Sequence, residues 1–455
     1  MFAEVLAAQK LFFQSRSTLD LRFRLDQLKK LYKALEISEA AIFDALRLDF
    51  KKSAFESYGT EIAQVKGEIK YLLKNLPRLM KPVRVKSGVA SWPAKSYVYV
   101  EPYGVSLIIG PWNYPLMLVL MPLVGAMAAG NCVILKPSEL APHTAAVINK
   151  IVSELYDQSY ITVVEGGAEE TQSLLSLQFD HIFFTGSVKV GKIVYEAAAK
   201  NLTPCILELG GKSPCIVDEK ADIEISARRI VWGKFVNAGQ TCVAPDYLLV
   251  HKSIKRQLLA CLNKYLVDFY GNDAQKSPDF PRIINEKNYR RLKELVHQGQ
   301  LAAGGKCDDD TLFIAPTILN NISWDDPVME DEIFGPILPV LEFDELDKAI
   351  VAIRNRPRPL ALYYFGSEKK KQQKVISELS YGGGCINDTL LHFGSPNVPV
   401  GGVGQSGIGK YHGKDSFAVF SNRKGIVQKG TRIDVSLRYP PYEGKLNFLK
   451  WILKL

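Results

Sequence analysis

Apolar and polar positions follow two different periods along this chain. Within residues 1–80, apolar side chains recur at three- and four-residue steps, as at Leu21, Leu25, Leu28, Tyr32 and Leu35. This spacing predicts helices, and Pro77 and Pro82 mark their end. Residues 83–85 and 97–100 instead alternate with period two across a turn-rich segment, which predicts a hairpin that projects from the main body. We expect such an arm to make subunit contacts.

A stretch from Pro102 to Leu135 contains no Asp, Glu, Lys or Arg and is long enough to resemble a membrane span. Its prolines and glycines would break a continuous lipid-facing helix. The pattern predicts a strand over 105–110, a helix over 116–129 and a second strand from 132. Because parallel strands buried on both faces are unbroken apolar runs, we interpret the stretch as a buried βαβ unit.

Strands and helices continue to alternate beyond this unit, with strands expected at 160–164, 181–184 and 204–209. This alternation predicts an α/β fold with a doubly wound, Rossmann-like parallel sheet. After residues 210–211 the rhythm starts again with a strand at 214–218, which predicts a second α/β domain. The chain should therefore contain two α/β domains and a small β arm.

Composition narrows the class of protein. The 455 residues suggest about three domains. With 47% hydrophobic and 23% charged residues, the chain is not mostly disordered, collagen-like or coiled-coil. The net charge of +9 is spread along the sequence, so we expect no nucleic-acid partner. Glu4 and Lys10 interrupt the apolar N-terminus, which predicts a soluble amphipathic helix, not a signal peptide. We expect a cytoplasmic protein without a transmembrane segment.

No metal site is expected. The seven cysteines are scattered and never spaced as CxxC, and the six histidines include no HExxH pair. Residues 401–407, GGVGQSG, contain the spacing GxGxxG, but no strand precedes them, so we predict a loop. A better dinucleotide site is FFTGSVKVGK, where a strand ends at Thr185 and a helix opens, with Gly186, Ser187 and Gly191 as candidates. Backbone N–H groups at such a helix start can bind a pyrophosphate, although an ordinary βα turn has the same pattern.

Two side chains stand out as candidates for catalysis. Cys242 lies in NAGQTCVAP, a loop-like setting in which a thiol can be exposed and its thiolate stabilised. Glu208 ends the otherwise apolar strand CILEL, where burial would raise its pKa towards that of a useful general base. The alternatives are a buried structural cysteine and a salt-bridged structural glutamate.

Five short segments together resemble aldehyde dehydrogenases, namely PWNYP at 111–115, KPSE at 136–139, ELGGKSP at 208–214, GQTC at 239–242 and EIFGP at 332–336. They occur in order and at family-like spacing, and the resemblance runs from about residue 55 to 430. The segments GGVGQSGIGKYHGKDSFAVFS and RYPPY further resemble the class 3 branch, which acts on fatty and aromatic aldehydes and is typically dimeric.

The resemblance implies an order of reaction steps. Cys242 would attack the aldehyde to give a thiohemiacetal, and the amide of Asn113 with the N–H of Cys242 would hold the oxyanion. After hydride transfer leaves a thioester, Glu208 would activate water to release the acid. It also implies an NAD(P)-binding domain (1–81 and 104–209), a catalytic domain (210–408), and an oligomerisation arm with a C-terminal tail (82–103 and 409–455).

The resemblance places the cofactor on a defined set of residues. Lys136 and Glu139 would contact the adenosine ribose, Gly186, Ser187 and Gly191 the pyrophosphate, and Glu332 and Phe334 the nicotinamide half. A carboxylate at Glu139 disfavours the 2′-phosphate of NADP, so we expect NAD, with NADP as the alternative. Apolar candidates for the aldehyde site are Tyr114, Trp232, Val236 and Leu390, for which core packing is the competing interpretation.

The C-terminal segment KLNFLKWILKL is basic and amphipathic, and too short to span a bilayer. It could lie on a membrane surface or dock onto the partner of a homodimer, and we favour docking. Three other functions remain open at this level: a coenzyme-A-acylating dehydrogenase, which needs no water-activating carboxylate; a cysteine hydrolase, which needs a histidine partner; and a non-catalytic structural protein on the same fold.

Overall fold

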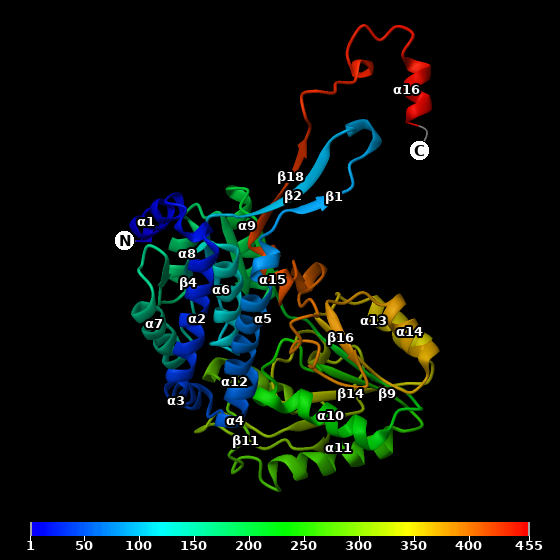
Figure 1. Ribbon diagram of the computed structural model, residues 1–455. Coiled ribbons are helices and arrows are strands. Elements are labelled where there is room, and N and C mark those ends of the chain that lie inside the picture. Colours follow the sequence, from blue (N-terminus) through cyan, green and yellow to red (C-terminus); the bar gives the residue numbers. More distant parts are fainter. Residues whose placement is uncertain (1, 454–455) are drawn as a thin grey trace.

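The computed structural model describes residues 2–453, which form two α/β bodies and a projecting β arm (Figure 1). The first body contains a six-stranded sheet in the order β17-β7-β6-β3-β4-β5. Its strands are β3 (Val105–Ile109), β4 (Cys132–Lys136), β5 (Ile161–Val163), β6 (His181–Thr185), β7 (Cys205–Glu208) and β17 (Gly407–Ile408). Neighbouring strands are parallel except β17, which pairs antiparallel with β7. The predicted α/β class and parallel sheet are confirmed.

The uncharged stretch forms the predicted βαβ unit at the centre of this sheet. Strands β3 and β4 and the connecting helix α6 (Met117–Ala129) are buried along their whole length. An element covered on all sides needs no polar face, which explains the absence of charge. Strand β3 lies where the chain order reverses, between β4 and β6. Ligands of doubly wound sheets bind at the carboxyl ends of strands beside such a point.

Helices surround the first sheet. Those before it are α1 (Phe2–Gln14), α2 (Leu21–Ile37), α3 (Glu39–Phe50), α4 (Ala54–Ser57) and α5 (Ala63–Leu79), with a π-helical turn, η2 (Tyr58–Ile62), between α4 and α5. The helices that connect later strands of the sheet along the chain are α7 (Pro142–Leu155), α8 (Ala168–Leu175) and α9 (Val188–Lys200). Of the apolar residues whose spacing predicted a helix here, Leu28 and Leu35 are completely buried in α2, and Asp20 caps the start of α2 by accepting the N–H of Phe23. The predicted N-terminal helices are therefore confirmed.

The second body repeats this architecture around a seven-stranded sheet in the order β10-β13-β14-β9-β8-β15-β16. Its strands are β8 (Pro214–Val217), β9 (Tyr247–His251), β10 (Gln300–Ala303), β13 (Thr317–Asn320), β14 (Ile337–Phe343), β15 (Ala361–Phe365) and β16 (Gly383–Ile386), and a separate pair is formed by β11 (Cys307–Asp308) and β12 (Phe313–Ile314). Its helices are α10 (Ile223–Phe235), α11 (Lys255–Tyr270), α12 (Glu286–Leu295), α13 (Leu346–Arg354) and α14 (Lys369–Glu378).

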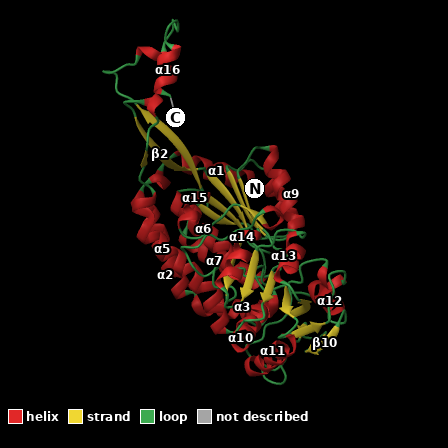
Figure 2. Ribbon diagram, turned by 90° about the vertical axis from the view of Figure 1, so that its right-hand side faces the viewer, coloured by secondary structure: helices red, strands yellow, loops and turns green. Residues whose placement is uncertain are grey.

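The arm is a three-stranded antiparallel sheet that extends away from both bodies (Figure 2). Strand β2 (Lys95–Pro102) lies between β1 (Val83–Val85) and β18 (Ser421–Gln428), and Val83 pairs with Val98, as the predicted hairpin requires. Beyond it lies α16 (Leu446–Ile452). No helix within residues 2–453 is both long and apolar enough to cross a membrane.

The segment between the second sheet and the arm returns to the first body. Strand β17 joins the first sheet, although the expected boundary assigns residues up to 408 to the second domain. Helix α15 (Lys414–Val419) then packs against α6, and Gly125 of α6 leaves the space for this contact, since a Cβ there would lie 2.9 Å from the carbonyl oxygen of Ser416.

Candidate active site

Two cavities meet at the loop that follows α10. The first, of about 730 Å³, has a mainly apolar wall that includes Tyr114, Trp232 and Phe269. The second, of about 600 Å³, lies at the carboxyl ends of β3, β6 and β7. Cys242 lines both cavities, together with Leu118 and Phe393. A thiol at this position can contact molecules that enter from either side.

A left-handed turn carries Cys242 to this junction. After α10, Asn237 and Ala238 have φ values of 53° and 51°, and Gly239 has a φ of 72°. Left-handed conformations of non-glycine residues cost of the order of 1–3 kcal/mol each, so contacts from outside must hold the turn. Gly239 is required for a second reason, because a Cβ there would lie 2.2 Å from the carbonyl oxygen of Gly335.

The Cys242 thiol lies in an apolar and acidic environment. Burial raises its pKa to about 12, and the carboxyls of Glu332 and Glu208 act in the same direction. Backbone N–H groups of Cys242 and Val243 act against this rise. The thiol is therefore protonated at neutral pH, and formation of the thiolate requires a positive charge or a base close by.

Asn113 lies in the loop after β3, and its side chain is directed at the loop of residues 236–242, called the cysteine loop, which carries Cys242. Its Nδ2 donates to the carbonyl oxygen of Gln240 at 3.0 Å, and its own carbonyl accepts from Nδ2 of Asn237 at 2.8 Å. An amide nitrogen carries two N–H groups, and Gln240 uses one of them. The other can donate to an oxygen bound beside Cys242.

Glu208 is the last residue of β7 and is only 4% exposed. Its Oε1 has no hydrogen-bond partner among the described residues. Burial raises the pKa of this carboxyl well above its usual range, while Lys410 acts in the opposite direction. An unpaired buried carboxylate is costly, and such groups concentrate at functional sites.

Glu332 and Phe334 face the second cavity from a loop that is fixed on both sides. The intervening Ile333 donates its N–H to Asp246 at 2.9 Å and accepts from Arg291 at 2.7 Å. Phe334 has a φ of 51° and packs edge-on against Trp112, with 5.3 Å between ring centroids. Burial, with a smaller contribution from Asp246, raises the pKa of Glu332 to about 8.

The turn between β6 and α9 forms the floor of the second cavity. Gly186 and Ser187 line it, and Ser187 caps α9 by accepting the N–H of Val190 at 3.4 Å. Gly191 lies below the surface, where a Cβ would meet Leu209 at 2.6 Å, so this glycine allows α9 to pack closely on the sheet. The predicted strand-to-helix context is confirmed.

Lys136 and Glu139 lie at the end of β4, outside the residues that line either cavity. Lys136 Nζ donates to the carbonyl oxygen of Pro137 at 2.8 Å and pairs with Glu139 at 3.8 Å. Glu139 is half exposed, with 50% of its side chain accessible, and so is open to a ligand from solvent.

The second cavity has the features that a nicotinamide dinucleotide requires. It is lined by the N-terminus of α9 and by an aromatic pair, Trp112 and Phe334. Thr185 Oγ1, in the same wall, is buried without a hydrogen-bond partner among the described residues. An unsatisfied hydroxyl in a cleft can be satisfied by a polar ligand.

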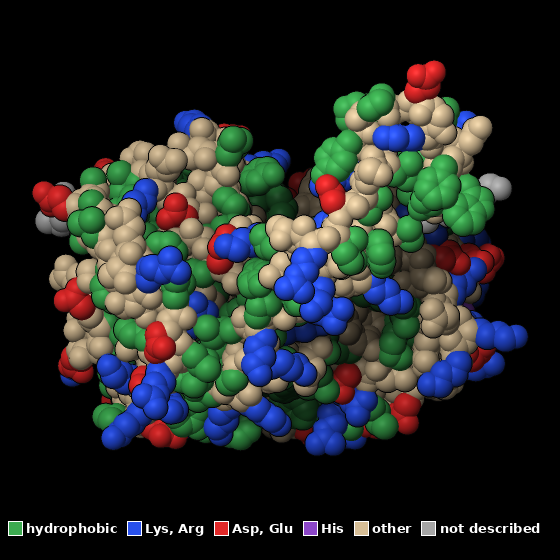
Figure 3. Space-filling model, turned by 45° about the horizontal axis from the view of Figure 1, so that its top comes forward, with side chains coloured by type: hydrophobic (Ala, Val, Ile, Leu, Met, Phe, Trp, Pro, Cys, Tyr) green, Lys and Arg blue, Asp and Glu red, His purple; other side chains and the backbone are tan. Residues whose placement is uncertain are grey.

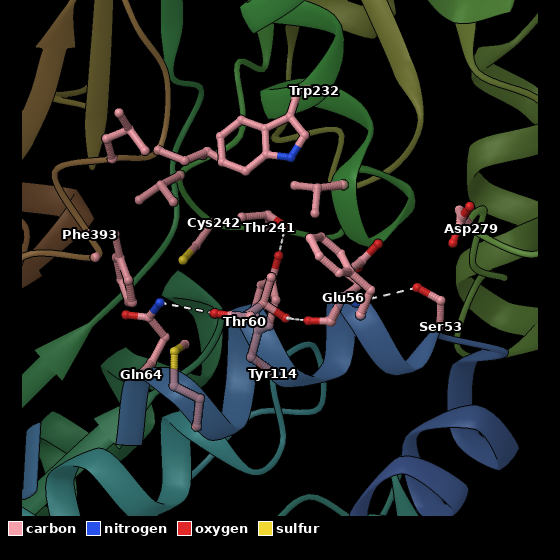
Figure 4. A pocket seen from close by; sticks show the side chains of 18 of the residues that line it. Ser53, Glu56, Thr60, Gln64, Tyr114, Trp232, Thr241, Cys242, Asp279 and Phe393 are labelled. Carbon is pink, nitrogen blue, oxygen red and sulfur yellow. Dashed lines mark hydrogen bonds between the residues drawn. The ribbon is translucent and has the colours of Figure 1, made fainter. Parts of the chain in front are cut away.

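The first cavity contains all four apolar residues that the sequence singled out. Tyr114, Trp232, Val236 and Leu390 line it, and Figure 4 shows Tyr114 and Trp232 on opposite sides of Cys242. The hydroxyls of Tyr114 and Thr241 are 2.6 Å apart, which ties the cavity wall to the residue before Cys242. Such a surface suits an apolar molecule with one reactive end at the thiol.

Several residues that line the two cavities were not predicted from the sequence. Glu56, Thr60 and Gln64 enter the first cavity from the helical segment before the sheet (Figure 4). Nothing in their local sequence indicates this, because only the tertiary fold brings the segment beside α10. The sequence analysis also did not single out Lys410, the cation that lowers the pKa of Glu208. Its Nζ donates to the carbonyl oxygen of Gly382 at 2.9 Å. A lysine inside an otherwise glycine-rich segment, GGVGQSGIGK, was the available signal.

Within residues 2–453 there is no group of three or more His, Cys, Asp or Glu side chains that could hold a metal ion.

Comparison with known proteins identifies the family of this chain. The model of the aldehyde dehydrogenase family matches residues 3–426. A relative from Staphylococcus aureus, 4,4′-diaponeurosporen-aldehyde dehydrogenase, is 50% identical over 447 residues, which are 98% of this chain and 97% of that protein.

Two further matches cover nearly the whole chain. A dimeric, NADP-preferring aldehyde dehydrogenase from Rattus norvegicus is 45% identical, over 95% of this chain and 96% of its own length. A solved structure, the substrate-bound state of the Staphylococcus aureus enzyme AldH, superimposes with a TM-score of 0.97 at 49% identity and covers both chains completely. This chain therefore belongs to the aldehyde dehydrogenase family, in its class 3-like branch, and is an NAD(P)-dependent oxidoreductase acting on aldehydes.

Proposed function

We propose that the protein oxidises medium- or long-chain aliphatic or aromatic aldehydes to carboxylic acids, with Cys242 as nucleophile. One observation carries the proposal: Cys242 lies in the wall shared by an apolar cavity and a polar cavity with cofactor-binding features. The aldehyde would enter through the first cavity and the cofactor through the second. The two then meet at the same sulfur atom.

The first half of the reaction uses three groups of the chain. The Cys242 thiolate attacks the carbonyl carbon and forms a C–S bond, and the oxygen becomes an oxyanion. The free N–H of Asn113 and the N–H of Cys242 stabilise that oxygen. The cofactor, when bound, supplies the hydride acceptor and a positive charge that favours the thiolate. Loss of hydride from the thiohemiacetal carbon leaves a thioester on Cys242.

The second half releases the acid. Glu208 removes a proton from water, the hydroxide attacks the thioester carbon, and the C–S bond breaks to return Cys242 and a carboxylic acid. Burial raises the pKa of Glu208, which makes its carboxylate a stronger base towards water. A coenzyme-A-acylating enzyme would not need this carboxylate, and its presence favours hydrolysis.

A role in cofactor binding is proposed for seven residues: Lys136, Glu139, Gly186, Ser187, Gly191, Glu332 and Phe334. Of these, Glu139 would set the choice between NAD and NADP, since it would approach the ribose 2′-hydroxyl. We propose NAD as the preferred cofactor, with NADP as an alternative substrate. Gly191 would act through the packing of α9 and not by direct contact.

The size and lining of the first cavity support a long or aromatic substrate. The cavity volume of about 730 Å³ is larger than a two- or three-carbon aldehyde needs. Apolar surface is supplied by Tyr114, Trp232, Val236 and Leu390. The Staphylococcus aureus relative, which is named 4,4′-diaponeurosporen-aldehyde dehydrogenase, supports the same class of substrate. The decisive assay is NAD and NADP reduction by the purified protein with n-alkanals of two to twelve carbons and with benzaldehyde. A kcat/KM that falls with chain length would contradict the proposal.

Two variants test the chemical roles. Cys242→Ala should abolish aldehyde-dependent cofactor reduction. Glu208→Gln should retain one burst equivalent of reduced cofactor and then stall with an acylated enzyme, which intact-protein mass spectrometry would detect. Normal turnover by Cys242→Ala would refute the assignment, and the complete absence of a burst in Glu208→Gln would refute the role of Glu208.

We further propose that the protein is a cytoplasmic homodimer assembled through the arm and the C-terminal tail. The lobe formed by the tail exposes apolar side chains (Figure 3), among them Tyr442, Leu446, Phe448, Leu449 and Trp451. Such a surface is expected to be covered by another surface. Truncation after Pro441 should produce monomers in sedimentation experiments. An intact dimer that has lost binding to liposomes would instead support membrane contact.

A further inference from the structure

One short helical segment of the first body holds both the loop that carries Cys242 and the loop that carries Asn113. Glu56, on α4, extends its carboxylate to the loop of Cys242, where Oε1 accepts the N–H of Asn237 at 2.9 Å. Asn237 is the first residue of the left-handed turn described above. The strained turn therefore begins at a hydrogen bond that comes from another part of the chain.

Glu61, five residues later, holds the loop of Asn113 in the same way. Its Oε2 accepts the N–H groups of Leu116 and Met117 at 3.0 and 2.9 Å. These are donors at the start of α6, where a negative charge is favoured. Asn113 lies three residues before this anchor, so the position of its amide depends on Glu61.

Lys52 connects the two carboxylates. Its Nζ binds Oε1 of Glu61 at 3.1 Å, and neither side chain is exposed to solvent. The same ammonium lies 4.4 Å from the ring centroid of Tyr114 and favours the charged form of Glu56. Other titratable groups that face Glu56 are Glu61, Asp279 and Tyr270. A buried pair of this kind keeps a defined geometry because breaking it leaves an uncompensated charge.

The backbone between these residues is unusual in a way that fits this arrangement. In an α-helix of 3.6 residues per turn, side chains five residues apart point about 140° away from each other. Residues 58–62 form a π-helical turn, with i→i+5 hydrogen bonds that bring positions five apart closer to one face. Glu56 and Glu61 can then serve two adjacent loops from one segment.

We propose that Lys52, Glu56 and Glu61 form a clamp that sets the position of Cys242 relative to Asn113, with Glu56 as a positioning residue for the nucleophile. This inference rests on the proposed function of Cys242. Glu56 touches neither the sulfur nor the oxyanion donors and acts only through the turn that begins at Asn237. The residue lines the aldehyde cavity, so its effect on the thiol must be measured without aldehyde.

The test compares two variants of Glu56 with a matched control. Glu56→Gln keeps an oxygen that can accept the N–H of Asn237, whereas Glu56→Ala removes it. Glu68→Ala is the control, because Glu68 is buried and, like Glu56, accepts a backbone N–H, that of Gly413, but lines neither cavity. The readouts are the rate of Cys242 alkylation by iodoacetamide, followed by peptide mass spectrometry, the pre-steady-state burst of reduced cofactor, and the thermal midpoint.

We expect Glu56→Ala to lower both the alkylation rate and the burst rate about tenfold or more, Glu56→Gln to recover most of both, and Glu68→Ala to lose thermal stability alone. Wild-type alkylation and burst rates in Glu56→Ala would overturn the clamp, and so would equal losses in Glu56→Ala and Glu68→Ala. Turnover by Cys242→Ala would refute the proposed function itself, independently of these variants.

Discussion

Removal of the Asn113 amide tests the proposed oxyanion site most directly. The structure supplies two donors beside Cys242, the free N–H of Asn113 and the N–H of Cys242 itself. Loss of one donor from such a pair typically costs about 10²–10³ in rate, or about 2.7–4 kcal/mol of transition-state stabilisation. We therefore expect Asn113→Ala to reduce the burst rate of cofactor reduction by about two to three orders of magnitude.

A structural contribution must be separated from this effect. Asn113 also donates to the carbonyl oxygen of Gln240 at 3.0 Å, and loss of one such hydrogen bond costs about 0.5–1.5 kcal/mol of stability. That cost would appear in the free energy of unfolding and in the alkylation rate of Cys242, because Gln240 belongs to the cysteine loop. A true oxyanion effect appears only when aldehyde reacts.

Rapid mixing of enzyme and cofactor with aldehyde gives the burst rate, and iodoacetamide gives the reactivity of Cys242 in the same preparation. The expected result is a burst at least a hundredfold slower with an alkylation rate within about threefold of the wild type. A burst less than tenfold slower, or a loss of alkylation as large as the loss of burst rate, would refute the oxyanion role.

Three further outcomes follow from the electrostatics of the site. Because burial raises the pKa of Glu208, the rate of thioester hydrolysis should rise with pH through that pKa, and Glu208→Gln should lose this rise in pre-steady-state pH profiles. Glu139→Gln should increase kcat/KM for NADP relative to NAD, as measured with one aldehyde, and an unchanged ratio would exclude Glu139 from cofactor choice. The pKa of Glu56 is raised from 4.5 to about 7, so its contribution to stability is complete below pH 4.5 and is lost as pH rises through 7. Glu56→Gln should therefore gain about 3 kcal/mol relative to the wild type between pH 4.5 and pH 8 in urea unfolding, and a pH-independent difference would contradict the raised pKa.

The elements of the fold could be predicted from sequence because their patterns are local. The three- and four-residue spacing that includes Leu28 and Leu35 depends on burial within one helix, and the uncharged run depends on burial within the central βαβ unit. Strand β17 was not predictable in this way. Its two residues, Gly407 and Ile408, form a strand only because β7 offers an open edge, and no local pattern records that.

The residues proposed to react could be predicted from the sequence for a different reason. Cys242 and Glu208 each break the pattern of their surroundings, a thiol among small polar residues and a carboxyl in an apolar strand. Glu56 and Glu61 break no pattern, since charged residues are ordinary in a helical segment. Glu61 is buried and Glu56 partly buried because they pack against loops that lie 55 and 181 residues further along the chain, respectively.

The segment that carries Glu56 and Glu61 determines which substitutions near the site affect the reaction rate and which affect substrate preference. Because Cys242 and Asn113 lie on two irregular loops, neither loop can fix its own geometry through regular backbone hydrogen bonds. Glu56 and Glu61 supply hydrogen bonds to the two loops from one helical segment, so a shift of that segment would move both loops together and preserve the position of Cys242 relative to Asn113. A substitution in the same segment that removes one carboxylate moves one loop alone. Variation at Thr60 or Gln64, which line the first cavity and bind neither loop, should alter substrate preference at little cost to the rate of the chemical steps. Variation at Lys52, Glu56 or Glu61 should reduce the rate for every aldehyde.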